Sequence, residues 1–373
     1  MQECQPHWYI GLMSGTSLDG VDGVLAEFPE ARCHVRHHVA APLSAPLRAR
    51  MLALNTSGGD ELHLAALAAN ALAHVYAQVT HELLAASGLH AADIHAIGAH
   101  GQTVRHRPQE FDGSGYTIQL NNPALLAELT GITVVADFRR RDVAAGGQGA
   151  PLVPAFHHTV FGRGDQTRAI LNLGGMANLT VLRAGTAPTG WDCGPANALL
   201  DQWCQTHTGQ AYDDDGRWAR AGQVNDALLR TLLSEPYFAR PAPKSTGRDL
   251  FNLAWLQAHL SAITPLPPVD VQATLTELTV HACAHDLRHS APDARELIVC
   301  GGGALNGHLM QRLQALLPGC AVTSSEPHGL PPQQVEAAAF AWLARQCLLG
   351  QPGNLPSATG AHGPRILGAI HQA

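Results

Sequence analysis

The segment IGLMSGTSLDGVD, residues 10–22, places glycines, hydroxyl groups and two carboxylates between apolar runs. This pattern predicts a strand, a sharp turn and a second strand. Glycine backbone in such a turn can direct N–H groups at an anion, and Thr16 and Ser17 add hydroxyl donors. Asp19 and Asp22 would repel a bare phosphate, so a divalent cation is expected with it. The segment therefore predicts a phosphate site, although a glycine-rich hairpin with two solvated carboxylates has the same pattern.

Two further glycine turns follow apolar stretches in the second half of the chain. Gly174 and Gly175 lie between strands predicted over 168–173 and 179–182, which repeats the strand, turn and strand of the first segment. The stretch from Gly301 to Asn306 follows an apolar strand and precedes a predicted helix. Bare backbone at this third turn leaves room for a flat adenine ring.

Asp192 lies in the segment GWDCGPAN, residues 190–197, which opens a helix predicted to end near His207. A carboxylate in this position can be a general base, and the helix dipole would then help to keep it ionised. It can equally be an ordinary helix N-cap. The residue types leave both interpretations open.

Strands and helices alternate along the chain, and its 373 residues suggest two domains. We expect a first domain over 1–136 plus about 351–373, and a second over 137–350. The three glycine turns at strand ends resemble the sugar kinase and actin superfamily. That resemblance implies an α/β fold of two related ribonuclease-H-like domains with an interdomain cleft. An ordinary two-domain α/β protein with tight turns is the alternative.

The composition excludes several function classes. A net charge of −7 gives no electrostatic footprint for nucleic acid, and no apolar run approaches the ~20 residues of a membrane helix. The eight scattered cysteines contain no Cys-x-x-Cys pair, which favours a reducing, cytoplasmic setting. Lys244 is the only lysine and follows PAP rather than a Walker glycine loop, so any ATP site belongs to another fold.

Seven motifs together resemble the anhydro-N-acetylmuramic acid kinase family, over residues 9–370. They are GLMSGTSLDGVD (11–22), HGQTVRH (100–106), VVADFR (134–139), DVAAGGQGAPLVPAFH (142–157), NLGG (172–175), DCGP (192–195) and KSTGRD (244–249). The resemblance implies a bacterial cell-wall recycling enzyme. It would convert ATP, 1,6-anhydro-N-acetylmuramic acid and water to N-acetylmuramic acid 6-phosphate and ADP.

The resemblance also implies roles for individual residues. Asp192 matches the catalytic base, and Asp19 and Asp22 are candidate Mg²⁺ residues. The expected ATP contacts are Gly15, Thr16, Ser17, Leu18, Asp19, Gly20, Val21, Asp22, Gly174, Gly175, Asn178, Gly301, Gly302, Gly303 and Asn306.

Four residues are candidates for holding the sugar. His100 and Gln102 follow an apolar strand, where α/β folds place ligands. Arg141 can bind the lactyl carboxylate through a two-bond fork, but three successive arginines are also typical of a solvated loop. Glu336 is the fourth candidate, although an acidic residue early in a helix also suits the helix dipole.

Three rival functions remain. The chain could be a kinase of another amino or anhydro sugar, or an actin-type switch that hydrolyses ATP without a sugar. His281, His285 and His289 recur every four residues and could bind zinc, but no Glu follows His281 as a hydrolytic zinc motif requires. The expected partners are an amino sugar and ATP, without nucleic acid or membrane, and a homodimer is left open.

Overall fold

The computed structural model describes residues 7–15, 18, 20–29, 32–164 and 166–373. The chain forms two compact units, which we call unit 1 (Met1–Phe161 and Gln333–Ala373) and unit 2 (Gly162–Pro332). No helix in these described ranges is long and apolar enough to span a bilayer.

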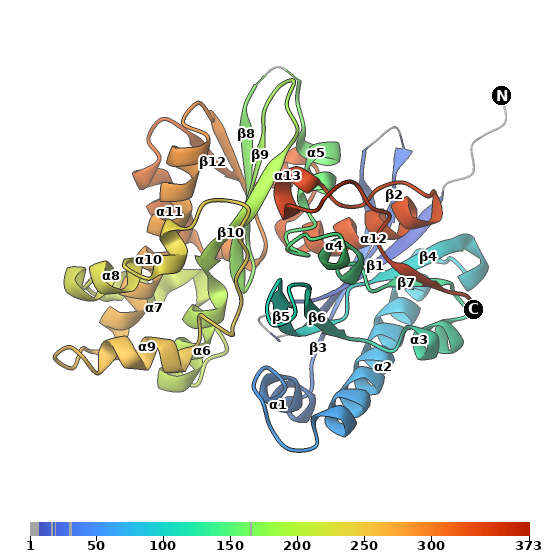
Figure 1. Ribbon diagram of the computed structural model, residues 1–373, viewed down its shortest axis with the longest axis horizontal. Coiled ribbons are helices and arrows are strands. Elements are labelled where there is room, and N and C mark those ends of the chain that lie inside the picture. Colours follow the sequence, from blue (N-terminus) through green and yellow to red (C-terminus); the bar gives the residue numbers. More distant parts are fainter. Residues whose placement is uncertain (1–6, 16–17, 19, 30–31, 165) are drawn as a thin grey trace. The chain divides into compact units, whose positions relative to one another are not determined.

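Unit 1 contains a six-stranded sheet in the order β13-β7-β4-β1-β2-β3 (Figure 1). The strands are β1 (Trp8–Ser14), β2 (Gly20–Glu27), β3 (His34–Pro42), β4 (Ile94–Ala99), β7 (Val134–Ala136) and β13 (Ala369–His371). The first three form an antiparallel meander, β4 lies parallel to β1, and β7 lies parallel to β4. A separate hairpin, β5 (Gln102–Pro108) and β6 (Gly115–Leu120), follows β4. Residues 116–120 (YTIQL) favour a strand by sequence alone.

The helices α2 (Glu61–Ser87) and α12 (Val335–Leu348) cover opposite faces of this sheet. The other α-helices of unit 1 are α1 (Ala45–Ala53), α3 (Pro123–Thr130), α4 (Arg140–Ala144), α5 (Pro154–Phe161) and α13 (Pro356–Thr359). A Cβ added at Gly23 would lie 2.3 Å from Val79 of α2. One added at Gly11, on the other face, would lie 1.8 Å from the carbonyl oxygen of Ala337 in α12. Glycine at position 11 therefore lets α12 approach the strand backbone closely.

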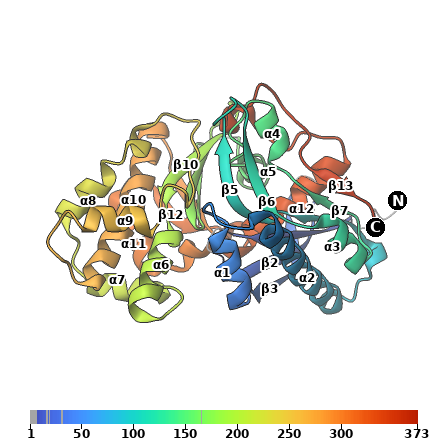
Figure 2. The same cartoon turned by 60° about the horizontal axis from the view of Figure 1, so that its bottom comes forward.

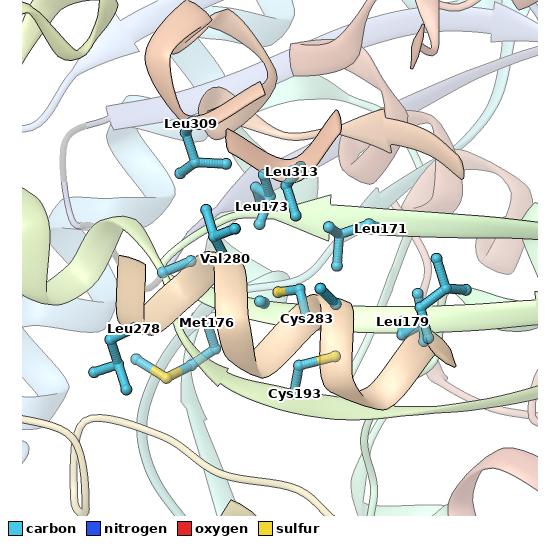
Figure 3. Close-up of a cluster of buried hydrophobic side chains, with 14 of the residues drawn as sticks. Leu171, Leu173, Met176, Leu179, Cys193, Leu278, Val280, Cys283, Leu309 and Leu313 are labelled. Atoms are coloured by element: carbon cyan, nitrogen blue, oxygen red, sulfur yellow. The ribbon is translucent and has the colours of Figure 1, made fainter. Parts of the chain in front are cut away.

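Unit 2 contains a five-stranded sheet in the order β10-β9-β8-β11-β12. Its strands are β8 (Arg168–Leu173), β9 (Met176–Leu182), β10 (Thr189–Pro195), β11 (Glu296–Cys300) and β12 (Ala321–Ser324). Its α-helices are α6 (Asn197–Thr208), α7 (Arg217–Ala221), α8 (Asp226–Leu233), α9 (Leu253–Leu260), α10 (Pro268–Ser290) and α11 (Gly307–Leu316), which Figure 2 shows from a second direction. Two odd-numbered residues of β8, Leu171 and Leu173, pack in one apolar core with Val280 of α10 and Leu309 and Leu313 of α11 (Figure 3).

The two sheets share one topology. In each, three antiparallel strands are followed by two strands parallel to the first, so that β1, β2, β3, β4 and β7 correspond to β8, β9, β10, β11 and β12. This correspondence confirms the predicted α/β class of two related domains.

The unit boundaries differ from the predicted domain boundaries at 136 and 350. Residues 137–161 and 333–350 belong to unit 1. Phe156 of α5 packs against Trp342 of α12, with ring centroids 6.2 Å apart, and α12 lies on β1 and β4. Periodicity identifies such helices but not the sheet that they cover.

Candidate functional site

Three polar side chains form a row across the sheet of unit 2. Asn172 of β8 pairs with Asn178 of β9, and Asn178 pairs with Asp192 of β10. Directly paired residues share one face of a sheet. Because Leu171 and Leu173 face the core beneath α10 and α11, the row lies on the opposite face, at the carboxyl end of β8.

A β-bulge at Cys193 sets the direction of the Asp192 side chain. Asp192 pairs with Asn178, but Gly194 pairs with the next residue of β9, so Cys193 is an extra residue. Such a bulge bends a strand and redirects a side chain. Gly194 has a φ of +149°, and a Cβ there would lie 2.7 Å from the Phe238 ring. A side chain at position 194 would therefore disturb the bulge.

Asp192 is 7% exposed and is held at three atoms. Its carboxylate Oδ2 accepts a hydrogen bond from the backbone N–H of Thr246 at 3.0 Å. Its N–H donates to the carbonyl of Lys244 at 3.1 Å, and its carbonyl accepts from the Tyr237 hydroxyl at 2.7 Å. Burial raises the pKa of Tyr237, and the nearby Asp192 charge raises it further, so the hydroxyl keeps its proton and remains a donor.

Asp192 is not a helix cap, because α6 begins at Asn197 with Ala196 as its N-cap residue. The N–H groups of Ala196 and Ala198 donate to the carbonyl of Gly175, and that of Asn197 donates to Gly174. These donors of the α6 terminus are thus paired with the glycine turn. The sequence missed β10 itself, since it treated this segment only as the approach to a helix.

The other residues predicted to contact ATP in unit 2 lie at two strand ends. The Asn178 Oδ1 atom is buried and has no hydrogen-bond partner among the described residues. An unpaired acceptor fits a donor such as the water shell that Mg²⁺ usually retains. Gly301 has a φ of +78°, and a Cβ there would lie 2.5 Å from Asn172 Oδ1. Gly302 and Gly303 begin the following turn, and Asn306 caps α11 through its Oδ1, which accepts from the Leu309 N–H at 3.0 Å.

Part of the first turn that the sequence predicts to bind phosphate can be described. Thr16, Ser17 and Asp19 lie outside the described residues. Leu18 is buried with a φ of +59°, and its N–H donates to the carbonyl of Gly15 at 3.2 Å. Gly20 and Val21 begin β2.

Asp22 lies on β2, and its Oδ1 is 2.9 Å from Nε2 of His38 on β3. The predicted metal residue is therefore part of an acid–histidine pair. Among the described residues, no three His, Cys, Asp or Glu side chains are arranged to hold a metal ion. His281, one of the three histidines that recur every four residues, instead lies 3.5 Å from Glu277.

Gln102 and His100 each form a hydrogen bond with a residue of β1. The Ser14 hydroxyl donates to Gln102 Oε1 at 2.5 Å, and the His100 N–H donates to the carbonyl of Leu12 at 3.0 Å. Burial, and then the Arg139 charge, hold the pKa of His100 well below its usual range. His100 is therefore neutral, and its Nε2 accepts from Arg139 Nε at 3.1 Å.

The three successive arginines have different environments. Arg139 joins His100 and also donates to the carbonyl of Gly149 at 2.8 Å, whereas Arg140 lies 3.6 Å from Asp137. The predicted sugar residue Arg141 is exposed. The sequence missed Arg139, because a run of identical side chains does not distinguish its members.

Two more features complete this part of unit 1. Asp142 is fully buried and accepts hydrogen bonds from the Gly149 N–H, the Asn354 amide and the Thr359 hydroxyl, at 2.8, 2.6 and 2.8 Å. It joins the loop after α4 to the C-terminal segment. Glu336 lies half-buried in the first turn of α12.

Comparisons with known proteins give a consistent result. The family model for anhydro-N-acetylmuramic acid kinase matches residues 7–373. The anhydro-N-acetylmuramic acid kinases of Variovorax paradoxus and Albidiferax ferrireducens are 62% and 60% identical, each covering 98% of this chain and 99% of the relative. That of Cupriavidus pinatubonensis is 57% identical, covering 97% of this chain and 98% of the relative.

Solved structures are more distant. The activator of the 2-hydroxyisocaproyl-CoA dehydratase from Clostridium difficile aligns with a TM-score of 0.46 and 13% identity, covering 91% of this chain and 97% of that one. The ROK hexokinase of Thermus thermophilus aligns with a TM-score of 0.36 and 17% identity, covering 91% and 99%. The full-length match to the family model and the high identity to these relatives show that the chain belongs to the anhydro-N-acetylmuramic acid kinase family.

Proposed function

We propose that this chain is an ATP-dependent kinase of 1,6-anhydro-N-acetylmuramic acid that opens the anhydro ring and phosphorylates O6. The product would be N-acetylmuramic acid 6-phosphate, which suits the recycling of peptidoglycan fragments. Family membership supports this reaction class. The structural observation that carries it is the buried Asp192 carboxylate, held on a bulge by a backbone N–H.

The substrate chemistry requires a base. The anhydro sugar has no free 6-hydroxyl, because O6 is bonded to C1. Asp192 would take a proton from a water molecule whose oxygen attacks C1, and the C1–O6 bond would break. The released O6 would attack the γ-phosphorus, and the bond from that phosphorus to the ADP oxygen would break.

The remaining assignments are also part of the proposal. The ATP contacts would be the segment Gly15–Asp22, Gly174, Gly175, Asn178, Gly301–Gly303 and Asn306. The sugar contacts would be His100, Gln102, Arg141 and Glu336. Asp19 and Asp22 would hold Mg²⁺, which when bound supplies positive charge to the phosphoryl oxygens.

Isotope labelling tests the reaction. In 18O-labelled water, a short reaction should place label on the anomeric carbon and none in the phosphate, because O6 stays with the sugar. An unlabelled product incubated in labelled water corrects for anomeric exchange. Label in the phosphate would show that water attacks ATP, and the chain would be an ATPase.

An Asp192→Asn substitution tests the base. It keeps the size of the side chain but removes proton acceptance, so turnover should fall at least ~100-fold while ATP and sugar still bind. Asp226→Asn, an exposed carboxylate at the start of α8, is the matched control and should stay within about twofold of wild type. Near-normal turnover in Asp192→Asn would contradict the assignment.

A further inference from the structure

Lys244 is a buried cation close to Asp192. It is 6% exposed, and its Nζ lies 3.4 Å from Asp286 Oδ2 of α10. The same carboxylate oxygen accepts a hydrogen bond from Trp191 Nε1 at 2.8 Å. The Lys244 Nζ also lies 5.1 Å from the centre of the Tyr237 ring and donates to the carbonyl of Phe238 at 3.4 Å. The ammonium is therefore fixed from several directions, including a cation–π contact.

The segment that carries Lys244 also holds Asp192. The carbonyl of Lys244 accepts from the Asp192 N–H, and the N–H of Thr246 donates to the Asp192 carboxylate at 3.1 and 3.0 Å respectively. A hydrogen bond to the charged form of a carboxylate favours that form. The position of the Thr246 N–H thus affects both the direction and the ionisation of the carboxylate.

This segment contains no regular secondary structure. Residues 240–247 lie in the connection between the short helix η4 (Pro236–Ala239) and α9, outside any helix or strand. Its backbone is therefore not fixed by a helical or sheet hydrogen-bond ladder, and beyond the bond from the Asp192 N–H to the Lys244 carbonyl it needs further anchors. The buried Lys244 side chain is such an anchor.

A buried ion pair is weak evidence for a stabilising role. Desolvation of two charges often offsets their attraction, and well-packed apolar residues can be as stable. Lys244 is also the only lysine in the chain. Its place beside the segment that holds Asp192 suggests a role in the reaction.

We infer that Lys244, paired with Asp286, is a positioning residue that holds the Thr246 N–H against the Asp192 carboxylate. This inference rests on the proposed function, in which Asp192 is the base. Lys244 acts through the backbone of its own segment and needs no contact with substrate.

The first test is Lys244→Met. We expect kcat to fall about tenfold, with KM for ATP and sugar within about twofold of wild type. In a plot of kcat/KM against pH, the acid limb should move to higher pH, because the Asp192 carboxylate loses the Thr246 N–H that favours its ionised form. Other titratable or charged groups nearby include Asp286, Tyr237, Cys193 and Arg240. Burial raises the pKa of Tyr237 and of Cys193, so neither of these titrates in the acid range.

Arg312→Met is the matched control. Arg312 of α11 pairs with the buried Glu277 of α10, with Nε and Oε1 2.5 Å apart. Each substitution removes the cationic partner of a carboxylate on α10. Asp286 keeps Trp191 as a partner in Lys244→Met, and Glu277 keeps His281 in Arg312→Met. Arg312→Met should lower the thermal midpoint as Lys244→Met does but leave the acid limb unmoved. A similar limb shift in both variants would overturn the inference.

Lys244→Met combined with Asp286→Asn separates stability from positioning. Removing both charges relieves the unpaired carboxylate, so the thermal midpoint should return toward wild type. We expect kcat and the acid limb to remain altered, because the anchor is still missing. Recovery of activity together with stability would overturn the inference.

Asp192→Asn distinguishes the two proposals. If that variant loses turnover while Lys244→Met retains the wild-type kcat and pH profile, the proposed base stands and the positioning role fails. If Asp192→Asn retains near-normal turnover, the base assignment fails and the positioning role fails with it, whereas the reaction itself is tested separately by the isotope labelling.

Discussion

The β1–β2 hairpin of unit 1 and the β8–β9 hairpin of unit 2 open the same strand order with different turns. Ser14 pairs with Val21, so residues 15–20 separate this pair along the chain, and of these 16, 17 and 19 lie outside the described residues. Leu173 pairs with Ala177, so only residues 174–176 separate the second pair, and Gly174 and Gly175 form the turn before β9. The glycine carbonyls of the shorter turn accept N–H groups of α6. The longer turn instead carries hydroxyl and acidic residues.

The two sheets also place their carboxylates on different strands. The residue pairs next to the turns are Ser14–Val21 in unit 1 and Leu173–Ala177 in unit 2. If these pairs are aligned, Asp22 corresponds to Asn178, and Ala40 of β3 corresponds to Asp192 of β10. Unit 1 has its carboxylate on the second strand, and unit 2 has it on the third. The same strand order can therefore carry different functional groups. The register decides which positions share a face of the sheet, but it does not decide which side chains occupy them.

We expect the largest change in stability at the close contact between α12 and β1 in unit 1. In Gly11→Ala the new Cβ would collide with the backbone of α12 at 1.8 Å, so the free energy of unfolding should fall by roughly 3 kcal/mol or more. Urea denaturation measures this change. Gly58→Ala is the control, because a Cβ there meets no atom within 4 Å. Wild-type stability in Gly11→Ala would show that α12 does not lie on β1.

Acid should destabilise unit 1 before unit 2. Burial lowers the pKa of His100, His106 and His157, all in unit 1, and for His106 and His157 to about 3. Between pH 6.5 and pH 5 the unfolded chain binds protons that these folded histidines do not, so stability falls as pH falls. The loss should reach about 2 kcal/mol at pH 5 for a fully buried histidine such as His157.

Hydrogen exchange at pH 7 and pH 5, corrected for intrinsic rates, measures this difference between the units. His308 and His328 of unit 2 are only partly buried, and burial lowers their pKa in the same direction. Earlier loss of protection in unit 2 than in unit 1 would contradict the prediction.

Asp22→Asn tests the carboxylate of unit 1. If Asp22 holds Mg²⁺, the concentration of Mg²⁺ for half-maximal activity should rise about tenfold, as expected when one interaction with a charged group is lost. His38→Gln removes the partner at 2.9 Å but keeps the carboxylate, so it should have a smaller effect. An unchanged Mg²⁺ dependence in Asp22→Asn would exclude this residue as a metal contact.

Asn178→Asp gives unit 2 the carboxylate that unit 1 carries on its second strand. The new charge would lie directly opposite Asp192, and like charges disfavour ionisation. The acid limb of kcat/KM should therefore move up by about half to one pH unit. Asn225→Asp, at the N-cap of α8, adds the same charge elsewhere and should leave the limb unchanged. No shift in Asn178→Asp would argue that Asp192 does not titrate in the rate-limiting step.

Much of the architecture could be predicted from the sequence because it depends on local patterns. The helical spacing of apolar residues over 60–87 is typical of a helix, and α2 spans Glu61–Ser87; apolar runs before glycine turns predicted β1, β8 and β11. The repeated strand, turn and strand predicted two related domains, which the shared strand order confirms. The sequence motifs also identified the family, which the full-length match confirms. The catalytic role of Asp192 stays a prediction.

Other features were decided by tertiary structure alone. The apolar residues of 335–349 favour a helix, but only packing shows that α12 covers the sheet of unit 1. Arg139 and Arg141 are chemically identical, and the fold alone brings Arg139 to His100. Thr246 meets Asp192 across a long stretch of sequence. A chain specifies local conformation through neighbouring residues, whereas such contacts depend on how distant segments are brought together by the topology.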